Sequence, residues 1–147
     1  MGIKVEYLEI DSVRADITAC RKAADLYEAG ARVYLWAGSQ AEAVLLDALL
    51  WTFDDNSFVP HGLWSGEGSI DDPVAVGWLG QKNPNNAGAL VIASDHADGE
   101  LTATAGLFGQ VCDFVPTMEG AAKRAARRRY KAFVSAGFNP VFTPLGE

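Results

Sequence analysis

The chain has 147 residues, of which 49% are hydrophobic and 21% are charged, and its formal net charge is −7. This length and composition predict one compact domain over residues 1–147 and exclude a disordered or fibrous chain. No apolar run approaches the roughly 18 residues of a membrane span, and the amino terminus lacks the basic start and apolar centre of a signal peptide. We therefore expect a cytoplasmic protein.

The first part of the chain shows a strand pattern, a helix pattern and a second strand pattern. In residues 3–7 apolar and polar side chains alternate, as in a half-buried strand. A helix is predicted next, with Asp11 and Ser12 offering its N-cap and Gly30 in the position just after its carboxyl end. Residues 31–37 are mostly apolar and predict the second strand.

Another helix signal follows the second strand directly. Ser39 and Glu42 match a capping box, which predicts a helix that begins there and continues to about Thr52. The order of predicted elements is therefore strand, helix, strand, helix. This alternation favours a parallel sheet with helices packed on its faces.

The second half of the chain begins with a long segment, residues 53–73, whose Asp, Asn, Ser, Gly and Pro residues predict a loop or an irregular lobe. Three further strands are predicted over residues 74–79, 89–94 and 110–115. Residues 97–109 have an ambiguous pattern and receive no assignment. Thr117 is the predicted N-cap of a last, long helix that ends before Gly137.

The turns after the first two strands lack the features of a phosphate-binding site. The first turn has no glycine and places Asp11 where a pyrophosphate would lie, and the second has the single glycine Gly38 and no Lys. Neither a P-loop nor a dinucleotide-binding glycine pattern occurs in the chain. We therefore expect neither a bound nucleotide nor another cofactor.

The chain carries no recognisable set of catalytic or metal-binding side chains. Cys20 and Cys112 are far apart, without a Cys-x-x-Cys pattern, and are expected to be small buried residues. His61 and His96 are the only histidines, and they complete no Ser-His-Asp or Cys-His pattern. We expect packing or surface roles for both histidines, no metal site and no enzymatic activity.

Half of the 12 Lys and Arg residues lie close together on the last predicted helix, residues 118–136, although the chain is acidic. These six are Lys123, Arg124, Arg127, Arg128, Arg129 and Lys131. At 100° per residue, all but Arg129 lie on one face, and Tyr130 flanks that face. Arg129 is expected to point inward, where it must snorkel or form a pair. The predicted apolar face consists of Met118, Ala122, Ala125, Phe133 and Ala136.

The basic face of this helix has more than one interpretation. It is either a solvated surface, favoured by the helix dipole near its carboxyl end, or a binding site for an anion. Because Tyr130 places apolar surface beside the charges, an acidic peptide with a hydrophobic end suits the face best. The alternative function is direct binding of single-stranded nucleic acid by helix 118–136, against the acidic remainder of the chain. An enzyme acting on an unrecognised ligand is the third class.

Six short motifs occur in order along the chain. They are residues 46–51 (LDALLW), 57–61 (SFVPH), 66–68 (GEG), 113–116 (DFVP), 129–132 (RYKA) and 136–138 (AGF). Together they resemble the chi subunit family of bacterial DNA polymerase III. The resemblance implies a three-layer α/β/α Rossmann-like fold with a largely parallel central sheet and no nucleotide-binding glycine motif. It also implies a non-catalytic accessory subunit of the clamp-loader complex that supports DNA replication.

The resemblance further implies two partner-binding surfaces. From the short apolar runs and the acidic remainder of the chain we expect no membrane association and no strong direct nucleic-acid binding. The first binds the acidic carboxyl-terminal tail of single-stranded DNA-binding protein, which ends in Pro-Phe, with Arg127 as the main anchor of its carboxylate. The residues of this surface are Val115, Lys123, Arg127, Tyr130, Lys131 and Phe133. The second binds the psi subunit or an equivalent clamp-loader partner through Trp51, Phe58, Pro60 and Leu63. The alternative for these four residues is an ordinary local cluster under the long loop.

Overall fold

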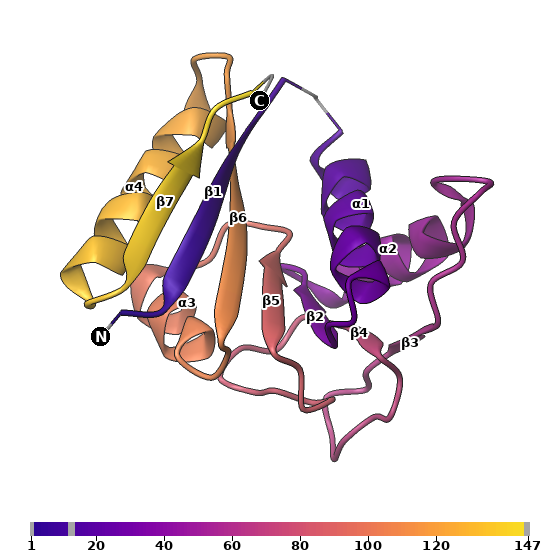
Figure 1. The fold of residues 1–147 in the computed structure, drawn as a ribbon. Coiled ribbons are helices and arrows are strands. Elements are labelled where there is room, and N and C mark those ends of the chain that lie inside the picture. The colour runs from indigo at the N-terminus through magenta and orange to yellow at the C-terminus, as the bar shows by residue number, and fades with distance from the viewer. Residues whose placement is uncertain (1, 12–13, 146–147) are drawn as a thin grey trace.

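A computed structural model describes residues 2–11 and 14–145, which form a central sheet with helices on both faces (Figure 1). The strands are β1 (Lys4–Ile10), β2 (Val33–Trp36), β3 (His61–Leu63), β4 (Val74–Gly77), β5 (Ala89–Ile92), β6 (Gln110–Pro116) and β7 (Asn139–Thr143). The helices are α1 (Ala15–Glu28), α2 (Gln40–Thr52), α3 (Asp98–Ala105) and α4 (Ala121–Ser135). The expected Rossmann-like three-layer fold is confirmed.

The sheet is parallel throughout its seven described strands, in the order β3-β4-β2-β5-β6-β1-β7. Every residue of β2, β4 and β5 is buried, as expected for central parallel strands that are covered on both sides. The first core, under α1 and α2, includes Cys20, Leu46, Val76 and Cys112. The second core, under α3 and α4, includes Tyr7, Trp36, Leu101 and Phe133. Both cysteines are buried and free, as predicted.

The chain leaves two neighbouring strands toward opposite faces of the sheet. From β1 it passes through α1 to β2, which lies beyond β5 and β6. From β6 it passes through α4 to β7, which lies on the other side of β1. Figure 1 shows α1 with α2 on one face of the sheet and α4 with α3 on the other. The first turns of α1 and α4 therefore flank the same edge of the sheet, above the ends of β1 and β6.

Helices α1 and α4 each end at a glycine, at the positions that the sequence predicts. Gly30 has a φ of 97°, and its amide donates to the Tyr27 carbonyl at 2.9 Å while the Ala31 amide donates to the Leu26 carbonyl at 2.9 Å. These two bonds form a Schellman motif. The same motif ends α4, where Gly137 has a φ of 90°. Glycine adopts this left-handed conformation without the steric cost of a Cβ atom.

The amino terminus of α2 also agrees with its prediction. The Ser39 hydroxyl accepts a hydrogen bond from the Glu42 amide at 3.2 Å, as a capping box requires. The Glu42 carboxylate does not complete the box, because it accepts a hydrogen bond from the Ser94 hydroxyl at 2.5 Å. This contact joins the first turn of α2 to the segment that follows β5.

Other predictions need correction. Thr117 does not cap α4, because its amide donates to the Ile10 carbonyl at 2.8 Å and extends the pairing of β6 with β1. Helix α4 begins four residues later, after Gly120. Strands β3 and β7 and helix α3 are elements that the sequence analysis did not assign. β3 lies within the predicted loop over residues 53–73, and α3 lies within the ambiguous residues 97–109. Of the two predicted N-cap residues of α1, Asp11 is not the cap, because the N-cap position is Arg14, and Ser12 is outside the described part of the chain.

Replacing Gly30 by Ala tests the role of its left-handed conformation. No atom lies within 4 Å of a Cβ built on Gly30, so a Gly30→Ala change carries a conformational cost without a clash. We expect the free energy of unfolding to fall by about 1 kcal/mol, measured by urea denaturation. Gly99→Ala is the matched control, because that position is also open but lies within α3. Equal stability changes in the two variants would contradict the assignment.

Candidate functional site

Helix α4 packs on the sheet through a narrow buried face. Ala126, Arg129 and Phe133 are its buried residues, at the spacing of one side of a helix. Ala122 and Ala136, which were expected on the apolar face, are exposed. The buried face is therefore rotated from the predicted one, and it includes an arginine at its centre.

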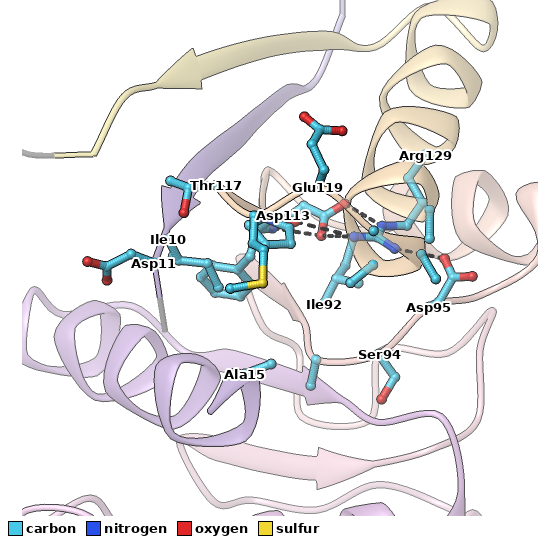
Figure 2. A pocket seen from close by; sticks show the side chains of 18 residues that line it. Ile10, Asp11, Ala15, Ile92, Ser94, Asp95, Asp113, Thr117, Glu119 and Arg129 are labelled. Atoms are coloured by element: carbon cyan, nitrogen blue, oxygen red, sulfur yellow. Dashed lines mark hydrogen bonds and ion pairs between the residues drawn. The ribbon is translucent and has the colours of Figure 1, made fainter. Parts of the chain in front are cut away.

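Arg129 forms the principal polar contact between α4 and the sheet. Its Nε and Nη2 atoms donate to the two carboxylate oxygens of Asp113 at 2.8 and 3.2 Å, and Nη1 donates to Asp95 at 2.7 Å (Figure 2). Nη2 also donates to the Phe114 carbonyl at 3.3 Å. Both members of the Arg129–Asp113 pair are almost completely buried. The prediction that Arg129 points inward and is paired is confirmed.

The electrostatics of this cluster favour the charged forms of Arg129 and Asp95. Burial lowers the pKa of Arg129, but the carboxylates of Asp113 and Asp95 raise it by more, so the pKa lies above its ordinary value. Burial likewise raises the pKa of Asp95, and the guanidinium groups of Arg128 and Arg129 outweigh this and lower it. The guanidinium of Arg129 is thus charged, and three acceptor groups fix its position: the carboxylates of Asp113 and Asp95 and the Phe114 carbonyl.

Arg128 is not a free charge on the basic face. Its guanidinium contacts Asp95 at 2.9 and 3.0 Å, Asp98 at 2.9 Å and the His96 carbonyl at 2.6 Å. These partners lie between β5 and the first turn of α3. Arg128 therefore joins α4 to α3: it is exposed on the basic face, as predicted, but its charge is paired with acids.

Glu119 partly neutralises two of the candidate binding residues. Its carboxylate lies 3.0 Å from the Lys123 ammonium and 3.4 Å from the Arg127 guanidinium. The hydrogen bond from Lys123, with the nearby charge of Arg127, lowers the pKa of Glu119. The Glu119 and Arg127 side chains are 70% and 56% exposed, so solvent screens this pair strongly. Arg127 can exchange such a contact for another carboxylate at little cost.

The aromatic residues near the basic face lie at different depths. Tyr130 is 37% exposed, and its ring centroid lies 5.2 Å from that of Tyr7. Tyr7 lies in turn 6.2 Å from Phe133, which is completely buried. Val115, at the end of β6, is half-buried and packs against the same core. Phe133 therefore supports the aromatic surface from below, whereas Tyr130 reaches solvent.

The second predicted surface is an exposed aromatic cluster on α2 and the segment before β3. Trp51 is 54% exposed and Phe58 69% exposed, with ring centroids 6.1 Å apart. The buried His61 ring lies 4.3 Å from Trp51, and its two nitrogens contact the Val59 and Asp47 carbonyls at 2.7 and 2.9 Å. His61 thus has a packing role beneath Trp51. Among the other predicted residues, Pro60 is half-buried and Leu63 is exposed.

Residues 2–11 and 14–145 include neither a metal-binding cluster nor a membrane-spanning helix. No group of three or more His, Cys, Asp or Glu side chains there is arranged to hold a metal ion. No helix in the same residues has both the length and the apolar character needed to cross a membrane.

The fold has three layers, with a parallel sheet between two layers of helices, and its last helix carries basic and aromatic side chains. The sequence has no glycine-rich phosphate-binding turn. Together these features define a Rossmann-like α/β protein with surface sites. The family model described as DNA polymerase III chi subunit, HolC, matches residues 4–141. The chain belongs to this family and is therefore a DNA replication accessory subunit.

Three curated relatives carry the same family name, and the chain matches most of the length of each. The DNA polymerase III subunit chi of Escherichia coli is 38% identical over 122 residues, which cover 82% of this chain and 78% of the relative. The subunit of the same name from Haemophilus influenzae is 36% identical over 122 residues, covering 82% and 81%. That of Pseudomonas aeruginosa is 32% identical over 120 residues, covering 82% and 79%.

A solved structure of T4 UvsW is similar in fold. It superimposes with a TM-score of 0.64 over 98% of this chain and 41% of the UvsW chain, at 10% sequence identity. At this identity the similarity extends to the fold alone. It agrees with the Rossmann-like architecture.

Removing Arg129 tests its role in holding α4. We expect Arg129→Met to lower the free energy of unfolding by about 3–5 kcal/mol, because Asp113 would remain buried and unpaired. Arg128→Met is the control, since it removes from the same helix a cation that also pairs with Asp95, but at an exposed site. We expect it to lower the free energy of unfolding by less than about 1 kcal/mol. Chemical denaturation measures both.

A double variant separates the charge from the packing. Replacing Asp113 by Leu in the Arg129→Met background removes the unpaired carboxylate, so we expect much of the lost stability to return. If the double variant were less stable than Arg129→Met alone, the unpaired charge would not be the cause of the loss.

Proposed function

We propose that this chain is a non-catalytic adaptor of the DNA polymerase III clamp-loader complex that binds the acidic carboxyl-terminal tail of single-stranded DNA-binding protein. Membership of the chi subunit family supports the place in replication. The proposal includes a cytoplasmic location and a single domain over residues 1–147. The tail-binding surface comprises Val115, Lys123, Arg127, Tyr130, Lys131 and Phe133, with Phe133 in a supporting role.

The observation that carries the proposal is the exposed, weakly held guanidinium of Arg127. Its two hydrogen bonds to Glu119 are long, at 3.4 and 3.5 Å, and both residues are more than half exposed. A terminal carboxylate of a peptide can replace Glu119 and form a bidentate pair with the arginine. Tyr130 offers exposed aromatic surface three residues along α4 for the apolar end of the peptide.

The paired charges of α4 argue against direct binding of single-stranded nucleic acid. Arg128 and Arg129 are held by acids from the β5–α3 segment and β6, and Lys123 and Arg127 share Glu119. Among the described residues, only Arg124 and Lys131 of the six cations have no ion pair. Because affinity for phosphates grows with the number of free cations, such binding is expected to be weak.

We also propose that the cluster of Trp51, Phe58, Pro60 and Leu63 binds the psi subunit or an equivalent partner. Large aromatic residues are seldom exposed side by side unless another protein covers them. Trp51 and Phe58 are such a pair, and α2, which carries Trp51, lies on the opposite face of the sheet from α4 (Figure 1). This surface and the tail-binding surface can therefore be occupied together.

Substitution of Arg127 tests the tail-binding surface. A labelled acidic peptide ending in Pro-Phe is titrated with the protein and followed by fluorescence anisotropy. We expect Arg127→Ala to weaken binding by roughly tenfold or more, which is about 1.4 kcal/mol. Arg124→Ala is the matched control, because it removes the same charge one turn earlier on the same helix, at a residue without an ion pair to Glu119, and it should change the affinity by less than about threefold.

Two further titrations sharpen this test. Glu119→Gln should strengthen binding, because it removes the carboxylate that competes for Arg127. Removing the terminal Phe from the peptide should weaken binding to the unchanged protein. Equal losses in Arg124→Ala and Arg127→Ala would mean that charge alone attracts the peptide, and the anchoring role of Arg127 would have to be abandoned.

The second surface is tested by truncating its exposed aromatic residues. Phe58→Ala and Trp51→Ala should each reduce co-purification with the psi-type partner while leaving tail-peptide binding unchanged. Leu107→Ala is the control, since Leu107 is 48% exposed and lies outside both surfaces. Co-purification that survives both aromatic changes would remove this cluster from the interface.

A further inference from the structure

Three exposed apolar side chains lie where α4 packs beside β7. Tyr130 and Val134 come from α4 and are 37% and 53% exposed, and Phe142 comes from the edge strand β7 and is 49% exposed. α4 packs on both β6 and β7, so the helix lies over this edge of the sheet (Figure 1). Neither core includes Val134 or Phe142. A group of exposed apolar side chains of this kind is typical of an interaction surface.

The direction of α4 turns Tyr130 and Val134 toward β7. Arg128 faces α3, since its guanidinium contacts Asp98 at the beginning of that helix. At about 100° per residue, Tyr130 and Val134 lie about 160° and 120° around the helix from Arg128. They therefore face away from α3, and the contact of Tyr130 with Tyr7 places this side of α4 over β1 and its neighbour β7.

The register of the sheet puts Phe142 on the face that α4 covers. Phe142 lies opposite Tyr7 in the parallel pairing of β7 with β1, and paired residues of neighbouring strands point to the same face. Tyr7 points into the core under α4, where its ring centroid lies 5.2 Å from that of Tyr130. Tyr130 and Phe142 are thus both neighbours of Tyr7. Val141, the preceding residue of β7, points to the opposite face.

The edge strand is held at both ends, so Phe142 has a fixed position. At its beginning the Asn139 amide donates to the Ile3 carbonyl at 2.9 Å. Just after its end the Leu145 amide donates to the Glu9 carboxylate at 3.0 Å. A ligand that packs on Phe142 therefore finds an ordered backbone, which lowers the entropic cost of binding.

The exposed guanidinium of Arg127 lies next to this apolar surface. Arg127, Tyr130 and Val134 fall within about 60° of one another around α4, and Arg127 precedes Tyr130 by about 4.5 Å along the helix axis. The sequence of α4 contains no acid, and Glu119, before the helix, holds Arg127 only loosely. A ligand that fits this arrangement has a carboxylate and a large apolar group close together. The last residue of a peptide carries both on one Cα atom.

We propose that Phe142, together with Tyr130 and Val134, binds the terminal phenylalanine side chain of the acidic tail and determines the preference for a large apolar residue at that position. The terminal carboxylate pairs with Arg127 while the ring packs on Tyr130 and Phe142. This inference rests on the proposed tail-binding function and adds Val134 and Phe142 to its surface.

A cycle of changes in the protein and in the peptide tests this assignment. Labelled acidic peptides ending in Pro-Phe and in Pro-Ala are titrated with the full chain and with its Phe142→Ala variant, followed by fluorescence anisotropy. We expect Phe142→Ala to weaken binding of the Pro-Phe peptide by about fivefold, because the contact between the two rings is lost. Binding of the Pro-Ala peptide should change by less than about twofold, since that peptide has no ring to contact Phe142.

Val141→Ala is the matched control, because Val141 is the neighbouring residue of β7, is 39% exposed and points to the other face of the sheet. It should leave both affinities within about twofold of those of the unchanged chain. Phe142→Tyr keeps the ring and should keep the preference for the Pro-Phe peptide. Thermal melting of each variant confirms that it is folded.

An NMR titration of the isotopically labelled full chain locates the ring of the peptide. We expect the Pro-Phe peptide to shift the methyl resonances of Val134 and the ring resonances of Phe142, and the Pro-Ala peptide to shift them much less. The alternative location is the pocket at the carboxyl ends of β1, β5 and β6, which is lined by Ile92 and Ala125. Shifts at those two residues without shifts at Phe142 would overturn the proposal.

Failure of this inference and failure of the tail-binding function give different results. If the Pro-Phe peptide binds the unchanged chain and Phe142→Ala weakens neither peptide, or weakens both equally, the tail-binding function stands and Phe142 does not hold the terminal ring. If neither peptide binds the unchanged chain, the function and this inference are both wrong.

Discussion

The buried ion pair between Arg129 and Asp113 is the contact on which both sides of α4 depend. A charge this deeply buried is costly unless its partners satisfy it, and Arg129 has acceptors on β6 and after β5. The pair fixes the rotation of α4 about its own axis. That rotation turns Tyr130 and Arg127 toward solvent on one side and Arg128 toward α3 on the other. The proposed tail surface and the pocket at the carboxyl ends of β1, β5 and β6, which both residues of the pair line, therefore share one structural support.

The charge of α4 is distributed in a way that composition does not reveal. Six cations on one helix of an acidic chain suggest a broad basic surface, yet acids outside the helix hold Arg128 and Arg129. Glu119, just before the helix, holds Lys123 and Arg127 loosely. What reaches solvent is a smaller basic area next to Tyr130. Such an area suits a terminal carboxylate with an adjoining apolar side chain better than it suits a long phosphate chain.

Local signals in the sequence predicted local structure well. Gly30 and Gly137 end their helices because only glycine adopts the required conformation freely, and Ser39 begins α2 through a side-chain bond to its own first turn. The inward direction of Arg129 followed from its angle on the helix. Its acid partners did not, because Asp95 and Asp113 are brought to it by tertiary structure.

The elements that the sequence analysis missed are those with weak local patterns. α3 buries a threonine beside Leu101 and Ala105, so its apolar periodicity is poor. β3 has three residues, and β7 is largely exposed at the edge of the sheet, so neither shows regular alternation. The pocket at the carboxyl ends of β1, β5 and β6 lay beyond prediction for a different reason. It arises from the opposite directions in which the chain leaves β1 and β6, and no local sequence pattern marks that reversal.

The position of β1 in the sheet has a consequence for how the chain folds. Both of its neighbours come from the last third of the sequence, with Val5 opposite Val111 on one side and Pro140 on the other. During synthesis the first strand is therefore made long before either partner exists. The sheet can begin to assemble around β2, β4 and β5, but β1 can add to it only after β6 has emerged from the ribosome. Pairing over so great a sequence separation carries a large entropic cost and is expected to be a slow step in folding.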